Sequence, residues 1–268
     1  MTEVGCIGVG RMGMPIVDRL VAAGHCVSAM GRTAGTRDRL TAAGAYAFAD
    51  LSGVVTASTE FVVVTVLTDA QVREVCLSGP LASRLSPGST IIIHTTGSPT
   101  TAEEVAEAMA PHDIRVIDAA VSGGPHNIAA GELTLFVGGD PSAVDDARAV
   151  LAAYADPVLH IGPVGDGQRV KLVNNALFAA QIGLVRAGVT LGARLGIPES
   201  VLLSALPHGS SDSRALAGIA RRGSVDAFAA AVGEFVGKDV EIVRNVATEL
   251  GGDLGLLEGL LPEHVRST

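Results

Sequence analysis

A glycine-rich turn between a short apolar strand and a helix constrains the fold of this chain more than any other feature. The apolar run Val4 to Val9 leads into the turn, and a helical pattern follows from Met12 to Ala23. The turn has the spacing G-x-G-x-x-G and consists of Gly8, Val9, Gly10, Arg11, Met12 and Gly13. In this context the first glycine permits a tight turn, the second lets the backbone approach a pyrophosphate, and the third allows close packing of helix on strand. We therefore expect a dinucleotide site where the first strand meets the first helix.

Strand and helix signals alternate through the first part of the chain. Continuous apolar, β-branched runs such as Phe61 to Leu67 are typical of strands buried on both faces of a parallel sheet. Further strands are expected at His25 to Met30, Ser89 to His94, Arg115 to Ala119, Glu132 to Val137 and Pro157 to Ile161. Helices are expected at Arg37 to Ala43, Thr101 to Ala110 and Ala143 to Ala153. The alternation predicts an α/β fold with a Rossmann-type, doubly wound parallel sheet.

The pattern changes to helices alone after Gly162. From Gln168 to Leu195 the sequence reads as one long helix, apolar nearly all round, which we expect to be buried inside the molecule or in a dimer. Shorter helices are expected at Glu199 to Ala205, Ala215 to Arg221, Asp226 to Val232 and Phe235 to Leu250. The expected domains are a dinucleotide-binding domain over residues 1–162 and an all-α domain, built on the long helix, over residues 163–268.

Composition excludes several classes of partner. The formal net charge of −9 and the absence of tryptophan disfavour nucleic acid and anionic membrane surfaces. The three cysteines lack C-x-x-C spacing, which indicates reduced thiols in a cytoplasmic protein. The best candidate for a membrane span, Ala176 to Leu195, is interrupted by Gln181, Arg186 and Arg194, so we expect none. We also expect no metal site.

The residues after the second strand indicate which dinucleotide binds. Chains that bind NAD usually place an acidic residue there, to hold the ribose 2′-hydroxyl. Here Arg32 and Thr33 follow the strand that ends at Met30, and the first acidic residue is Asp38. A guanidinium suits a 2′-phosphate, and Arg37 can add a contact. The expected cofactor is NADP, with NAD left open.

A lysine and an asparagine share one helix face shortly after Gly165. Lys171 and Asn175 are four residues apart, so on a helix they project from neighbouring points. A buried lysine beside a cationic nicotinamide has a lowered pKa, as a general base requires. The turn formed by Ser122, Gly123 and Gly124 can expose successive backbone amides to an anion.

Four motifs, in this order and spacing, resemble the β-hydroxyacid dehydrogenase family, which includes 3-hydroxyisobutyrate dehydrogenase and glyoxylate/succinic semialdehyde reductases. The first is the glycine-rich turn, continued by Met14 and Pro15. The others are Asp118 to Pro125 (continuing to Leu133), Gly162 to Asn175, and Lys238 with Asp239. Together they cover nearly the whole chain.

The resemblance implies roles for these residues. Lys171 looks like the lysine that handles the substrate hydroxyl proton, and Asn175 like the asparagine that orients the substrate, with Asn174 in support. The turn from Ser122 to Gly124 looks like the loop that grips the substrate carboxylate. Thr96 resembles a residue near both nicotinamide and substrate.

The resemblance also implies further cofactor contacts. Lys238 resembles the lysine that closes over the cofactor, and we assign Leu67 and Thr68 to the cofactor as well. Arg214 stands where the family commonly has a bulky aromatic residue, and Arg186 where many members have an acid. The stretch after Pro262 is short for the family's closing helix.

The leading hypothesis is an NADP-dependent oxidoreductase that interconverts a small β-hydroxy acid and its oxo or semialdehyde form, with Lys171 as general acid and base. Its expected partners are a small carboxylate-bearing substrate and a second copy of the chain, in a homodimer or higher homo-oligomer. An imine reductase is one alternative, although that group generally lacks the lysine. A non-catalytic NADP-binding dimer is another. A phosphosugar dehydrogenase is less expected, because the helical half offers only Arg214, Arg221 and Arg222 for a sugar phosphate.

Overall fold

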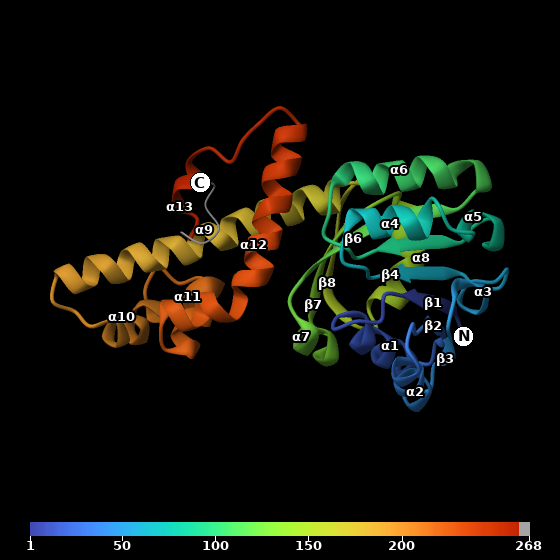
Figure 1. The fold of residues 1–268 in the computed structure, drawn as a ribbon, viewed down its shortest axis with the longest axis horizontal. Coiled ribbons are helices and arrows are strands. Elements are labelled where there is room, and N and C mark those ends of the chain that lie inside the picture. The colour runs from blue at the N-terminus through green and yellow to red at the C-terminus, as the bar shows by residue number, and fades with distance from the viewer. Residues whose placement is uncertain (263–268) are drawn as a thin grey trace. The chain divides into compact units, whose positions relative to one another are not determined.

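The computed structural model describes residues 1–262, apart from the side chain of Glu234. The expectation about a short closing helix concerns residues 263–268, which lie outside the described residues. The chain divides into two compact units, one from Met1 to Lys171 and one from Leu172 onward (Figure 1).

The first unit is built on an eight-stranded sheet with the order β3-β2-β1-β4-β5-β6-β7-β8. Its strands are β1 (Glu3–Ile7), β2 (Cys26–Met30), β3 (Tyr46–Phe48), β4 (Phe61–Val64), β5 (Thr90–Ile93), β6 (Arg115–Ser122), β7 (Leu133–Gly138) and β8 (Ala155–Gly162). Neighbouring strands run parallel except β6 and β7, which are antiparallel, from Asp118 beside Gly138 to Ser122 beside Thr134. The parallel sheet expected from the sequence is confirmed, with β6 and β7 as its antiparallel pair. The connection between these strands is short, whereas a parallel crossover needs about a dozen residues or more.

Helices cover both faces of this sheet (Figure 1). They are α1 (Gly13–Ala22), α2 (Ala34–Ala42), α3 (Leu51–Val54), α4 (Asp69–Cys76), α5 (Leu81–Arg84), α6 (Pro99–Met109), α7 (Pro125–Ala130) and α8 (Pro141–Leu151). The sequence pattern did not predict α3, α4, α5, α7 or β3. Four of these five elements are too short to show a hydrophobic period.

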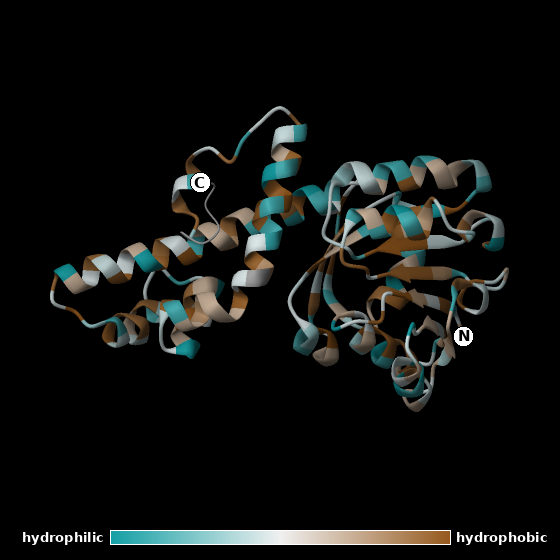
Figure 2. Cartoon of the chain, in the orientation of Figure 1, coloured by the Kyte–Doolittle hydropathy of each residue, from teal (hydrophilic) through white to brown (hydrophobic). Residues whose placement is uncertain are grey.

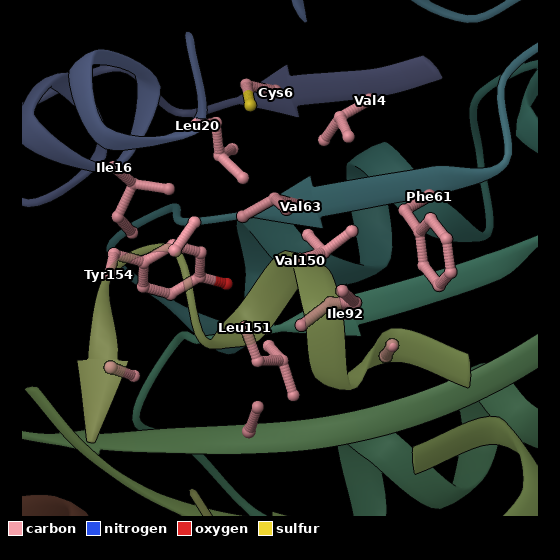
Figure 3. Packing of buried hydrophobic residues seen from close by; sticks show 14 of the residues in the cluster. Val4, Cys6, Ile16, Leu20, Phe61, Val63, Ile92, Val150, Leu151 and Tyr154 are labelled. Carbon is pink, nitrogen blue, oxygen red and sulfur yellow. The ribbon is translucent and has the colours of Figure 1, made fainter. Parts of the chain in front are cut away.

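Alternate residues of the central strands point into two separate hydrophobic layers. Val63 and Ile92 face one layer, together with Tyr154 and Leu151 (Figure 3). Val62 and Ile91 face the other. Burying an aliphatic side chain of this size contributes about 1.5–3 kcal/mol, so the strands are held from both sides. The strands accordingly carry much of the hydrophobic colour in Figure 2, whereas α4 and α6 show both colours.

The described part of the second unit is helical. Its elements are the long helix α9 (Asp166–Arg194), which starts in the first unit, and α10 (Glu199–Ala205), α11 (Arg214–Arg222), α12 (Val225–Glu249) and α13 (Leu256–Leu260). The two helices expected over residues 226–250 are one continuous helix, α12. Gly233 interrupts the apolar pattern there, but a single glycine costs a helix only about 1 kcal/mol.

Helix α9 keeps an apolar stripe exposed. Val173, Leu177, Leu184 and Leu191 are between 46% and 60% exposed. At 100° per residue they lie within about 40° of one another around the helix axis. By length and apolar content alone α9 could also cross a membrane, but the core helix of a soluble protein passes the same test. Only 28% of its most apolar stretch is buried, so within one chain this helix is less covered than its sequence suggested.

Candidate dinucleotide and substrate site

A groove lies at the carboxyl edge of the sheet, where the strand order changes direction between β1 and β4. Such a switch point is where open α/β sheets bind their ligands. The groove has a volume of about 1290 Å³. Among its lining residues are Gly8, Val9, Gly10, Arg32, Thr33 and Leu67. Six residues assigned to the cofactor from sequence therefore meet in one cavity.

The geometry of the glycine-rich turn fits a bound pyrophosphate. Gly8 has φ +94°, and a Cβ there would lie 2.3 Å from the Thr65 carbonyl oxygen. A Cβ on Gly13 would lie 2.2 Å from the Gly8 carbonyl oxygen, so helix α1 packs directly on the turn. Around Gly10, by contrast, no described atom outside Gly10 and its two chain neighbours lies within 4 Å of the Cβ position. The turn is closed where it packs on protein and open where a ligand would lie.

Arg11 and Met12 complete the turn without lining the groove. Met12 is the residue before α1, and Arg11 is exposed beside it. The backbone of this segment leads into the amino end of a ten-residue helix, where the helix dipole favours phosphate.

The end of β2 presents an arginine to the groove. Arg32 is exposed there, and Thr33 caps α2 by accepting the Thr36 N–H at 3.2 Å. The Arg37 guanidinium donates to the Gly31 carbonyl oxygen at 2.8 Å, so part of its hydrogen-bonding capacity holds the turn. Arg32 is thus the guanidinium of this turn that lines the cavity.

Leu67 and Thr68 follow β4, but only Leu67 lines the groove. Leu67 lines the groove and is 62% exposed, and its N–H donates to the Gln71 side-chain oxygen at 2.8 Å. The Thr68 hydroxyl accepts the Gln71 N–H at 3.3 Å and so caps α4. The pattern of a threonine followed three residues later by glutamine is a capping signal that the sequence analysis passed over.

The loop after β5, which contains Thr96, is held by buried and half-buried polar groups. Asp69 accepts the Ser98 N–H at 3.1 Å, and Thr95 donates its hydroxyl to the Val66 carbonyl oxygen at 2.9 Å. Gln168 is 1% exposed, and it donates to the Thr95 carbonyl oxygen at 2.7 Å. These contacts tie the loop with Thr96 to the loop that follows β4.

In the turn after β6, one of the backbone N–H groups expected to bind an anion already has a partner within the chain. β6 ends at Ser122, and Gly123 has φ +134°. The Gly124 N–H donates to the Asn127 side-chain oxygen at 2.8 Å, within the first turn of α7. The expectation of successive exposed amides is therefore corrected, because the amide of Gly124 is taken by Asn127. Sequence reasoning missed Asn127.

Asp118, in the middle of β6, caps helix α9 from a distance. It is fully buried, and its carboxylate accepts the Gly165 N–H at 2.7 Å and the Gln168 N–H at 2.8 Å. Burial raises the pKa of this carboxyl to about 7, although both amides favour its charged form. Asp118 and Gln168 fall within the sequence motifs, but the sequence assigned neither residue a role.

Lys171 and Asn175 lie one turn apart on α9, and both are at least nine-tenths buried. Among the described residues, the buried Asn175 side-chain nitrogen has no hydrogen-bond partner. A buried donor left unpaired costs about 1–3 kcal/mol, which a ligand oxygen would recover. Asn174 donates to the Asn175 side-chain oxygen at 3.4 Å, a weak contact.

Lys238 lies on α12 and is half-buried. It belongs to the second unit, as do Asn174 and Asn175, whereas the groove and Lys171 belong to the first. Within residues 1–262, no group of three or more histidine, cysteine, aspartate or glutamate side chains is arranged to hold a metal ion.

Comparison with known proteins connects both units to one family. Residues 3–162 match the NAD binding domain of 6-phosphogluconate dehydrogenase. Residues 165–260 match the NAD-binding domain of NADP-dependent 3-hydroxyisobutyrate dehydrogenase.

Individual relatives agree with these matches. The chain is 33% identical over 219 residues to an NAD-dependent L-serine dehydrogenase of Pseudomonas aeruginosa, covering 81% of this chain and 72% of the relative. It is 32% identical over 220 residues to an L-threonate dehydrogenase of Cupriavidus necator, covering 79% and 71%. A solved structure of Mycobacterium tuberculosis 3-hydroxyisobutyrate dehydrogenase with L-serine has a TM-score of 0.86 and 26% identity, covering 97% of this chain and 91% of that one. The chain is therefore an NAD(P)-dependent dehydrogenase of hydroxy acids and belongs to the β-hydroxyacid dehydrogenase family.

Proposed function

We propose that this enzyme uses NADP to interconvert a short β-hydroxy acid and its oxo or semialdehyde form, with Lys171 as general acid and base. The observation that carries the proposal is the pair Lys171 and Asn175, both buried and one turn apart on α9. With Gln168 they lie within about 60° around the helix axis, opposite the apolar stripe of α9. One face of the helix thus carries the buried polar groups.

The residues have distinct tasks in this reaction. The nicotinamide, when bound, exchanges a hydride with the hydroxyl-bearing carbon of the substrate. Lys171 Nζ takes the hydroxyl proton during oxidation and returns it during reduction. Asn175 Nδ2 donates to a substrate oxygen, which provides the partner that this nitrogen lacks. The turn from Ser122 to Gly124 receives the substrate carboxylate through backbone N–H groups other than that of Gly124, with Thr96 nearby.

Arg32 supports the preference for NADP. It is exposed, lines the groove directly after β2, and stands where an NAD-binding chain usually has an acid. Thr33 and Leu67 line the same groove, and Thr68 supports Leu67 by capping α4. We assign Lys238 to the cofactor on the resemblance of its motif alone.

The names of the relatives support a short hydroxy acid as substrate. Two are called L-serine and L-threonate dehydrogenases, and the solved relative is described with L-serine. The shared chemistry is a carboxylate close to an oxidisable hydroxyl, which suits one anion-binding turn and one proton acceptor.

A second copy of the chain is the occupant we propose for the apolar stripe of α9. Val173, Leu177, Leu184 and Leu191 are exposed on one side of the helix, and exposed apolar residues gathered in this way mark protein interfaces. A two-fold axis would place the stripe against itself, burying both copies at once. The three free cysteines fit a reducing compartment, and we place the homodimer in the cytoplasm.

Initial rates with NADP and NAD test this proposal directly. The panel consists of L-serine, L-threonate, 3-hydroxyisobutyrate and related semialdehydes, with cyclic imines as a separate arm. Turnover of a hydroxy acid, faster with NADP, is the expected result. Turnover of imines alone would favour an imine reductase. NADP binding without any turnover would favour a non-catalytic module, and either result would overturn the proposal.

A further inference from the structure

Two buried side chains hold the first turn of α9 from different directions. Asp118 reaches it from the middle of β6, and Gln168 reaches outward from it to the loop after β5. Neither side chain is more than 1% exposed. All of these groups lie within the first unit.

The contact from Asp118 fixes the helix against the sheet. Its carboxylate accepts one N–H before α9 begins, that of Gly165, and one inside the first turn, that of Gln168. The fit leaves no spare room: a Cβ on Gly167 would lie 2.4 Å from the Phe136 carbonyl oxygen, and one on Gly138 would lie 2.4 Å from Asp118 Oδ1. The start of α9 therefore packs directly on the backbone of the strands, and its position relative to the sheet is fixed.

The contact from Gln168 fixes the helix against the loop beside the dinucleotide groove. Its amide donates to the Thr95 carbonyl oxygen at 2.7 Å and accepts the Gly97 N–H at 3.2 Å. Thr96 lies between these two residues. Thr95 in turn donates to Val66, a residue that lines the groove. A chain of direct hydrogen bonds thus runs from the groove wall to the first turn of α9.

Lys171 follows Gln168 by three residues, so the two side chains lie about 60° apart around the axis and one turn apart along it. A helix turn is stiff, and any tilt or register change at Gln168 moves Lys171 with it. Displacing a reacting group by about 1 Å can cost a factor of about 100 in rate.

We infer that Asp118 and Gln168 are positioning residues, which set the place of the Lys171 amine relative to the groove and so control proton transfer. The inference rests on the proposed role of Lys171. It goes beyond capping, because a cap that served stability alone would need no second side chain directed at the loop containing Thr96.

The test compares Asp118→Asn and Gln168→Met with a matched control, Asp140→Asn. Asp140 also caps a helix with its carboxylate, accepting the Ser142 N–H of α8 at 2.9 Å, but it is exposed and its helix carries no proposed catalytic group. Steady-state rates of the folded enzymes with the best substrate and NADP are measured beside Lys171→Met. Hydrogen exchange of residues 163–172 reports the local structure without requiring turnover.

The expected result is a roughly tenfold or larger fall in kcat for Asp118→Asn and for Gln168→Met. The KM for NADP should change less than about threefold, and hydrogen exchange over residues 163–172 should be faster. Asp140→Asn keeps the kcat of the parent. If Lys171→Met loses activity while Asp118→Asn and Gln168→Met keep the kcat of the parent, the inference fails and the proposed function stands. If Lys171→Met is fully active, both fail. If Asp118→Asn does not fold, Gln168→Met alone tests the inference, because the polar contacts of the Gln168 side chain go only to the loop after β5.

Discussion

The His94 ring lies 2.8 Å from the Tyr154 hydroxyl, and both side chains are fully enclosed in the core of the first unit (Figure 3 shows Tyr154). His94 Nδ1 lies 2.6 Å from the Ala119 carbonyl oxygen, which can only accept. Nδ1 therefore carries the proton, and Nε2 accepts from the tyrosine. Burial lowers the pKa of His94 to about 4, so the ring is neutral at physiological pH. The pair joins the end of β5 to the start of β8.

Tyr154→Phe should remove the hydroxyl that donates to His94 Nε2 without changing the shape of the core. We expect the free energy of unfolding to fall by about 1–3 kcal/mol, because Nε2 is left buried and unpaired. Chemical denaturation at pH 7.5 measures the loss. Tyr46→Phe is the control, since Tyr46 is exposed. Equal stability of Tyr154→Phe and the parent would contradict the assigned hydrogen bond.

Asp118 should give the protein a distinctive dependence of stability on pH. Its folded-state pKa of about 7 lies above the ordinary value of 3.8, so between these pH values the folded state holds a proton that the unfolded state releases. Its contribution to stability is therefore full at low pH and is lost as pH rises towards 7. Relative to Asp118→Asn, the parent should lose about 2–3 kcal/mol between pH 5 and pH 8. Urea denaturation at each pH checks this, and His94 titrates equally in both proteins. If the difference in free energy of unfolding between the parent and Asp118→Asn does not change with pH, the raised pKa of Asp118 is contradicted.

Arg32→Ala should weaken NADP selectively. A charge-assisted bond from a guanidinium to a phosphate contributes about 1.5–3 kcal/mol, so the KM for NADP should rise roughly 10- to 100-fold. The KM for NAD, which lacks the 2′-phosphate, should change less than about threefold. Arg39→Ala is the matched control, because Arg39 is exposed on α2 and does not line the groove. An equal rise in KM for NADP and for NAD would show that Arg32 does not bind the 2′-phosphate.

Leu184→Glu should separate the proposed homodimer. It places a charge in the middle of the apolar stripe of α9, where Leu184 is 50% exposed in the single chain. Light scattering after gel filtration should give a dimer for the parent and a monomer for the variant. Leu256→Glu changes an even more exposed leucine on α13 and should leave the dimer intact. A monomeric parent would contradict the proposed interface.

The sequence predicted the parts of this molecule that repeat a local pattern. The strand-turn-helix around Gly8 and Gly13 was readable because each glycine meets a steric demand that neighbouring residues reveal. The long helix α9 was readable from its length. The short elements α3, α5 and α7 were not, because four to six residues are too few for a period to show.

The contacts that order the site could not be read in the same way. Asp118 binds backbone N–H groups 47 and 50 residues further along the chain, and backbone amides leave no trace in a sequence. Gln168 likewise binds the backbone of Thr95 and Gly97. The reversal of β7 depended on how the chain turns after Ser122, which strand patterns do not specify. The sequence proposes which residues carry the chemistry, whereas only the fold shows which contacts hold them.

The rate of Lys171→Met with the best hydroxy acid and NADP tests the central claim most directly. Methionine keeps the length and burial of the side chain but cannot exchange a proton. General acid–base catalysis typically contributes about 10²–10⁴ in rate, so kcat should fall by that factor while the Kd for NADP stays within about threefold. A variant that binds NADP normally and retains the parent's kcat would show that Lys171 does not carry the proton.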